Sequence, residues 1–124
     1  MTPEGEGLLL AAQAKLRAAE LLLTAGLHGD ASSRAYYAAF HAISALHLSR
    51  GNTFSSHAQL IGRFNKDFVR TGVFPPEFTR VVTRLFEDRQ VGDYDAMAEI
   101  TGDQSTQDVA DARRLVEAIS AYLR

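Results

Sequence analysis

The chain has 124 residues, is 46% hydrophobic and 23% charged, and carries a formal net charge of −2. This composition is typical of one globular domain, which we place over residues 1–124, and argues against a disordered chain or a generally basic nucleic-acid binder. Cysteine is absent, which excludes disulfides, thiolate nucleophiles and iron–sulfur clusters. No segment reads as a secretory signal or membrane span, so we expect a cytoplasmic protein without a membrane partner.

The first half of the sequence predicts two long helices. One, at about Glu4–Ala25, carries a single apolar stripe at three- and four-residue spacing. The other, at about Ala31–Arg50 with Asp30 as its N-cap, is apolar nearly all round, which predicts a central position. One face of this second helix is polar or amphipathic and carries Arg34, Tyr37, His41 and Ser44. This face is either a solvent-exposed rim or a polar groove.

A third helix is predicted at about Ser56–Thr71 and a fourth from Pro76 to about Arg89. His57 lies in the first turn of the third helix, on or beside its core-facing side, as a packing residue or a site residue. Arg89 continues the apolar stripe of the fourth helix, so its guanidinium points inward and needs an anionic or carbonyl partner.

After Arg89 we expect a break, a short helix near Ala96–Ile100, and a last helix from about Thr106 to Leu123 capped by Ser105 or Thr106. Glycine and proline separate these segments, and none shows the alternation of a strand. The sequence therefore predicts an all-α, antiparallel up-down bundle of four main helices plus a short fifth element.

Charged residues are segregated along the second half of the chain. Residues 50–84 contain six basic and two acidic side chains, whereas residues 90–112 contain six acidic and no basic ones. Such a pattern guides an anionic ligand or aligns a partner, or it reflects two ordinary solvated helix faces.

The motifs that would mark a phosphate-binding glycine loop, a zinc protease or a di-iron site are missing. We therefore predict no metal and no cofactor. Two groups of side chains remain as candidate sites: Arg34, Tyr37 and His41 on the second helix, and Arg89, Asp93 and Tyr94 with His57 behind them. Arginine and histidine together bind phosphate and stabilise charge during phosphodiester cleavage without a metal.

Residues 33–46, SRAYYAAFHAISAL, resemble the second helix of the HEPN-domain family. The resemblance continues in order through His57, residues 63–78 and LFEDRQVGDY at 85–94, where one prokaryotic branch carries a similar Arg-x-x-x-Asp-Tyr. It implies a bundle of four to five helices that pairs as a homodimer with a cleft at the interface. Many relatives are encoded beside a minimal nucleotidyltransferase and act as the toxin of a toxin–antitoxin pair.

Active relatives are metal-independent endoribonucleases with an arginine followed four to six residues later by histidine. Here no histidine follows Arg89, and Tyr94 takes that place; a phenol, with an ordinary pKa near 10, is a poorer general base than imidazole. By the resemblance, Tyr94 donates a hydrogen bond to a ligand or receives a nucleotidyl group from a partner enzyme. His57 or His41 would have to replace the missing histidine.

Three hypotheses follow. The first is a nucleotide- or RNA-binding regulatory protein, one half of a HEPN/nucleotidyltransferase pair. The second is a metal-independent endoribonuclease toxin with a rearranged site of Arg89, Tyr94 and His57. The third is a non-catalytic dimeric scaffold whose polar face only closes its own dimer.

Overall fold

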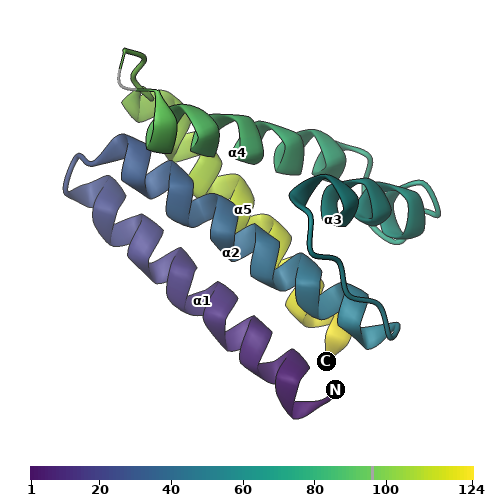
Figure 1. Ribbon diagram of the computed structural model, residues 1–124. Helices are drawn as coiled ribbons and strands as arrows, with labels where there is room; N and C mark the ends of the chain where they lie inside the picture. Colours follow the sequence, from purple (N-terminus) through teal and green to yellow (C-terminus); the bar gives the residue numbers. More distant parts are fainter. Residues whose placement is uncertain (96) are drawn as a thin grey trace.

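The computed structural model describes residues 1–95 and 97–124. Its elements, in chain order, are α1 (Pro3–Thr24), α2 (His28–Ser49), α3 (His57–Phe64), the π-helical turn η1 (Asn65–Val69), α4 (Glu77–Tyr94) and α5 (Gly102–Leu123). The four long helices alternate in direction, and α3 with η1 forms the short element at one end (Figure 1). This arrangement, with no strand in the described residues, confirms the predicted all-α antiparallel bundle. None of the described helices has the length and hydropathy needed to cross a membrane.

Helix α2 is the centre of the bundle, as its sequence predicts. It packs against α1, α4 and α5, and most of its small and apolar side chains are buried: Ala31, Ala35, Ala38, Ala39, Ala42, Ile43 and Leu46. Alanine allows neighbouring helices to approach closely because its side chain is a single methyl group. The apolar stripes of α1 and α5 cover α2 with buried Leu9, Ala12, Leu16 and Ala19, and with Val109, Ala112, Val116 and Ile119.

Helix α4 does not end at Arg89, so the predicted break there is wrong. The helix continues to Tyr94, one turn further. Arg89 and Asp93 form an ion pair at i,i+4 spacing, which supports this added turn. Gly92, which reads as a helix breaker in the sequence, lies instead against Gly29 at the start of α2.

The beginnings of α2 and α5 also differ from prediction. Helix α2 begins at His28, so Asp30 lies in its first turn rather than at its cap. Helix α5 begins at Gly102 because Thr101 and Gln104 form a reciprocal capping box. Of the predicted short helix at 96–100, residues 97–100 are not helical and residue 96 lies outside the described residues.

A partly buried ion-pair network joins α4 to α5. Arg84 Nε lies 3.0 Å from Asp108 Oδ1, and its Nη2 lies 2.8 Å from Asp111 Oδ2. Asp108 is fully buried. Burial, together with the nearby carboxyl of Asp88, raises the pKa of Asp108 to about 7, while Arg84 acts to lower it. Arg84, one of the six basic residues in 50–84, is therefore paired with two of the six acids in 90–112.

The contact between Gly29 and Gly92 predicts opposite effects of the same substitution at two helical glycines. A Cβ at position 92 would lie 2.8 Å from the Gly29 carbonyl oxygen, whereas a Cβ at Gly62 in α3 would meet nothing within 4 Å. We expect Gly92→Ala to destabilise the fold by about 1–3 kcal/mol through overpacking. Gly62→Ala should stabilise it by about 0.5–1 kcal/mol through helix propensity. Urea unfolding followed by circular dichroism measures both, and equal effects would contradict the close contact.

The raised pKa of Asp108 predicts a stability that falls with pH. Because the folded state holds this proton up to about pH 7, against an ordinary pKa of 3.8, the free energy of unfolding should decrease between these values. Relative to Asp108→Asn, the unsubstituted protein should be more stable at pH 5 than at pH 7.5 in urea unfolding. Asp103→Asn, at an exposed carboxyl in the first turn of α5, is the matched control. A pH-independent difference between the protein and Asp108→Asn would refute the prediction.

Candidate functional site

Arg89 is buried between α2 and α4, with only 9% of its surface exposed. Its Nη2 donates hydrogen bonds to the Tyr37 hydroxyl at 2.6 Å and the Tyr94 hydroxyl at 3.1 Å. Its Nε lies 3.2 Å from Asp93 Oδ2, an ion pair without the alignment of a hydrogen bond. Groups from both helices therefore hold the guanidinium in one orientation, as its place on the apolar stripe of α4 predicts.

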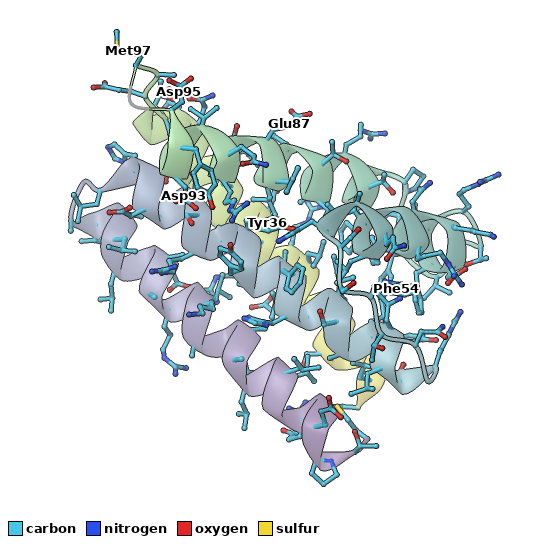
Figure 2. All side chains as sticks on the ribbon, in the orientation of Figure 1. Tyr36, Phe54, Glu87, Asp93, Asp95 and Met97 are labelled. Atoms are coloured by element: carbon cyan, nitrogen blue, oxygen red, sulfur yellow. The ribbon has the colours of Figure 1, made fainter. Side chains whose placement is uncertain are left out.

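The partners of Arg89 are held in turn by α2. Ser33 donates a hydrogen bond to Asp93 Oδ2 at 3.0 Å, and Figure 2 shows Asp93 on the side of α4 that faces α2. The Arg89 guanidinium carbon also lies 5.2 Å from the ring centre of Tyr37 and 5.1 Å from that of Tyr94. At these distances the aromatic rings stabilise the cation electrostatically.

The two predicted groups of site residues open onto a single cleft of about 520 Å³. It is lined by Lys15, Asp30, Ser33, Arg34, Tyr37, Phe40, His41, Arg89, Asp93 and Tyr94. Six of the seven residues singled out from the sequence thus lie together. Lys15, Ser33 and Phe40 are cleft residues that the sequence reasoning missed. The only local signal for Lys15 is its position as a cation beside the apolar stripe of α1.

His57, the seventh residue, does not line the cleft. Its Nδ1 lies 2.5 Å from the Tyr36 hydroxyl, and its ring packs against Phe40 and Phe86. Burial raises the pKa of Tyr36, so this hydroxyl keeps its proton, and it shares a hydrogen bond with Nδ1. Burial and the positive charge of Arg89 lower the pKa of His57. His57 is therefore a neutral imidazole behind the cleft, and Tyr36 is a further residue of the cluster that the sequence reasoning missed.

His41 is the histidine that lines the cleft. Its Nδ1 is buried without a hydrogen-bond partner. Burial and the nearby Lys15 lower its pKa, so the imidazole is neutral at pH 7. A neutral imidazole can accept a proton or hydrogen-bond a ligand.

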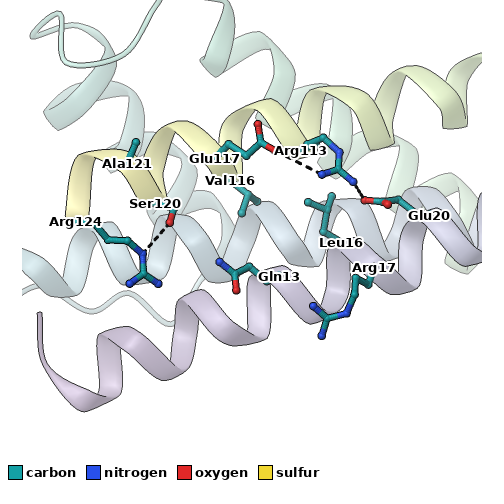
Figure 3. Close-up of a pocket in the computed structure, with 10 residues that line it drawn as sticks. All are labelled: Gln13, Leu16, Arg17, Glu20, Arg113, Val116, Glu117, Ser120, Ala121 and Arg124. Atoms are coloured by element: carbon teal, nitrogen blue, oxygen red, sulfur yellow. Dashed lines mark hydrogen bonds and ion pairs between the residues drawn. The ribbon is translucent and has the colours of Figure 1, made fainter.

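A second groove lies between α1 and α5 and has a volume of about 490 Å³ (Figure 3). Two of its three arginines pair with carboxylates, Arg113 with Glu20 and Glu117 and Arg124 with Glu6, while no ion pair among the described residues involves the third, Arg17. Two of the three cations of this groove are therefore already compensated within the protein. Among residues 1–95 and 97–124, no three His, Asp or Glu side chains gather in a way that could hold a metal ion.

A family model of the HEPN domain matches residues 6–123. The chain belongs to the HEPN domain family. A UPF0332 protein of Thermotoga maritima is 35% identical over 105 residues, which cover 85% of this chain and 80% of that protein. The Methanocaldococcus jannaschii protein named "Putative toxin MJ0605" is 33% identical over 109 residues, 88% of this chain and 77% of that protein.

The same fold occurs in a solved structure. The protein TT1696 from Thermus thermophilus superposes with a TM-score of 0.82 and 19% sequence identity, covering 97% of this HEPN domain and 98% of TT1696. This likeness shows the shared helical architecture.

The electrostatic coupling of His57 to Arg89 predicts a change in one histidine titration. We expect the pKa of His57 to lie below 6.5 and to rise in Arg89→Gln, because the substitution removes a repelling positive charge. The pKa of His47 is also lowered, by burial and, less strongly, by Arg63 and Arg50 but not by Arg89, so His47 is the internal control and should not move. NMR titration of the imidazole nitrogens measures both. A His57 pKa that is the same in both proteins would contradict the geometry.

Proposed function

We propose that this HEPN domain binds a phosphate-bearing ligand, a nucleotide or RNA, in the α2–α4 cleft. The observation that carries the proposal is the buried guanidinium of Arg89. Its Nη2 donates hydrogen bonds to two tyrosine hydroxyls. Its Nη1 donates none of the hydrogen bonds found among the described residues. A pre-oriented guanidinium with free donors is the group best suited to phosphate oxygens.

Aromatic side chains in the cleft support a nucleic-acid ligand over a simple inorganic anion. Tyr94 is 70% exposed and lies beside Arg89, while Tyr37 and Phe40 line the interior of the cleft. Unpaired bases stack on such rings while cations contact the backbone.

We further propose that the protein works as a homodimer and as one half of a regulatory, toxin–antitoxin-like pair with a minimal nucleotidyltransferase. Two relatives from Methanocaldococcus jannaschii carry names that describe them as toxins, which supports this role. Large apolar side chains are exposed at the end of α4 and just after it, Tyr94 at 70% and Met97 at 94%, and they support a protein contact there.

Arg89→Ala tests the binding proposal. Removing a charge-assisted hydrogen bond costs about 1.5–3 kcal/mol, so binding of a fluorescent hexauridylate should weaken roughly ten- to hundredfold. Arg80→Ala is the matched control, because Arg80 is an exposed arginine of the same helix that does not line the cleft. Fluorescence anisotropy at fixed salt measures affinity, thermal unfolding verifies that each variant is folded, and light scattering after gel filtration reports the dimer. Equal affinity of Arg89→Ala and the unsubstituted protein would refute the proposal.

A metal-independent ribonuclease is the second candidate function, and one observation favours it. His41, with its lowered pKa, lines the same cleft as Arg89 and Tyr94, so the role of general base falls to His41 rather than to His57. The binding reactions above, run with EDTA and resolved on a gel, separate the two functions. Cleavage that is lost in His41→Ala and kept in His57→Ala would replace the binding role by catalysis, and intact RNA would support binding alone.

A further inference from the structure

We propose that the cleft contains a second phosphate subsite, formed by Lys15 beside His41, and therefore takes two successive phosphates of a single-stranded RNA. This inference rests on the proposed function, in which Arg89 holds the first phosphate. It assigns a role to Lys15 and predicts that the cleft discriminates a dinucleotide from a ligand with one phosphate.

The cations of the cleft come from three helices. Arg89 lies on α4, Arg34 on α2 and Lys15 on α1, and all three line the same cavity. Along α2, His41 follows Tyr37, the hydrogen-bond partner of Arg89, by one turn, or about 6 Å of axial rise. Lys15 lies close enough to His41 for its charge to lower the pKa of that imidazole. Lys15 and His41 therefore mark a place in the cleft displaced along α2 from the Arg89 contact.

Two cations that line the cleft are not paired with a carboxylate in the described part of the chain. Arg89 is paired with Asp93, and Arg84, Arg113 and Arg124 have carboxylate partners. In the described part of the chain, neither Lys15 nor Arg34 lies within ion-pair distance of a carboxylate. The two acids that line the cleft are Asp30 and Asp93, and Asp93 is already held by Arg89 and Ser33. The cleft lining thus carries three cations, Lys15, Arg34 and Arg89, against these two acids.

An aromatic surface lies between the two subsites. The Phe40 ring is 6.3 Å from that of Tyr37 and 5.8 Å from that of His41, in edge-to-face geometry with each. A base between two bound phosphates would meet this surface, the arrangement by which single-stranded nucleic acid is held with little sequence preference. Two phosphates separated by a nucleoside, rather than one phosphate, fit this order of groups.

The two lysines of the chain, Lys15 and Lys66, provide a matched pair of variants. We expect Lys15→Gln to weaken binding of the 5′-phosphorylated dinucleotide pUpU about tenfold and to leave binding of uridine monophosphate within about twofold. Lys66→Gln, outside the cleft, should change neither. With hexauridylate, Lys15→Gln should also lower the slope of log affinity against log salt by about 0.7, the value for one lost contact to single-strand phosphate.

Chemical footprinting on the unsubstituted protein gives a measurement that does not depend on the folding of a variant. Acetylation with an N-hydroxysuccinimide ester, read by mass spectrometry, should be slowed at Lys15 by saturating hexauridylate and unchanged at Lys66. Equal acetylation of Lys15 with and without RNA would overturn the subsite.

The outcomes distinguish this inference from the proposed function. If Arg89→Ala weakens both ligands while Lys15→Gln weakens neither, the cleft holds one phosphate and the second subsite is refuted. If Arg89→Ala weakens neither ligand, the proposed function itself is refuted, whatever the behaviour of Lys15.

Discussion

The α2–α4 interface depends on one buried cation. The guanidinium of Arg89 keeps its proton at all physiological pH values, so its charge has to be compensated where it lies. Tyr37 supplies a hydroxyl from α2, while Asp93 and Tyr94 supply oxygens from the next turn of α4. These groups reach Arg89 together only if α4 continues past it and lies close to α2. Because Gly92 and Gly29 have no side chains, the backbones of α4 and α2 can approach each other closely at this point.

The parts of the fold that follow from periodicity could be predicted from the sequence. The buried stripes of α1 and α5, and the inward position of Arg89, depend on which residues share a helix face, and spacing alone decides this. The last turn of α4 could not be predicted in this way. Gly92 is unfavourable for a helix by local propensity, and its advantage arises only from a contact with Gly29, far away in sequence. The start of α5 did have a local signal, because Thr101 and Gln104 have capping-box spacing.

The candidate site was predictable in its parts but not in its assembly. The sequence places Arg34, Tyr37 and His41 on one face of α2, and it places Arg89 on the inner face of α4. That these faces meet in one cleft is a property of the packed bundle. Lys15 reaches the cleft from α1, and no local pattern connects it to residues on the other helices. The position of His57 outside the cleft could not be predicted for the same reason. Its hydrogen bond with Tyr36 forms only when the helices pack together.

The net charge of −2 is compatible with an anion-binding cleft, because two arginines of α4, Arg84 and Arg89, have different partners. Arg84 and Arg89 are five residues apart, which turns them about 140° from each other around the helix. On the α5 side, two carboxylates compensate Arg84. On the α2 side, Arg89 has one carboxylate and two neutral hydroxyls, and Lys15 and Arg34 add positive charge nearby. Asp108 and Asp111 thus join α4 to α5, and the side of α4 that faces α2 opens onto a cleft lined by three cations and two acids.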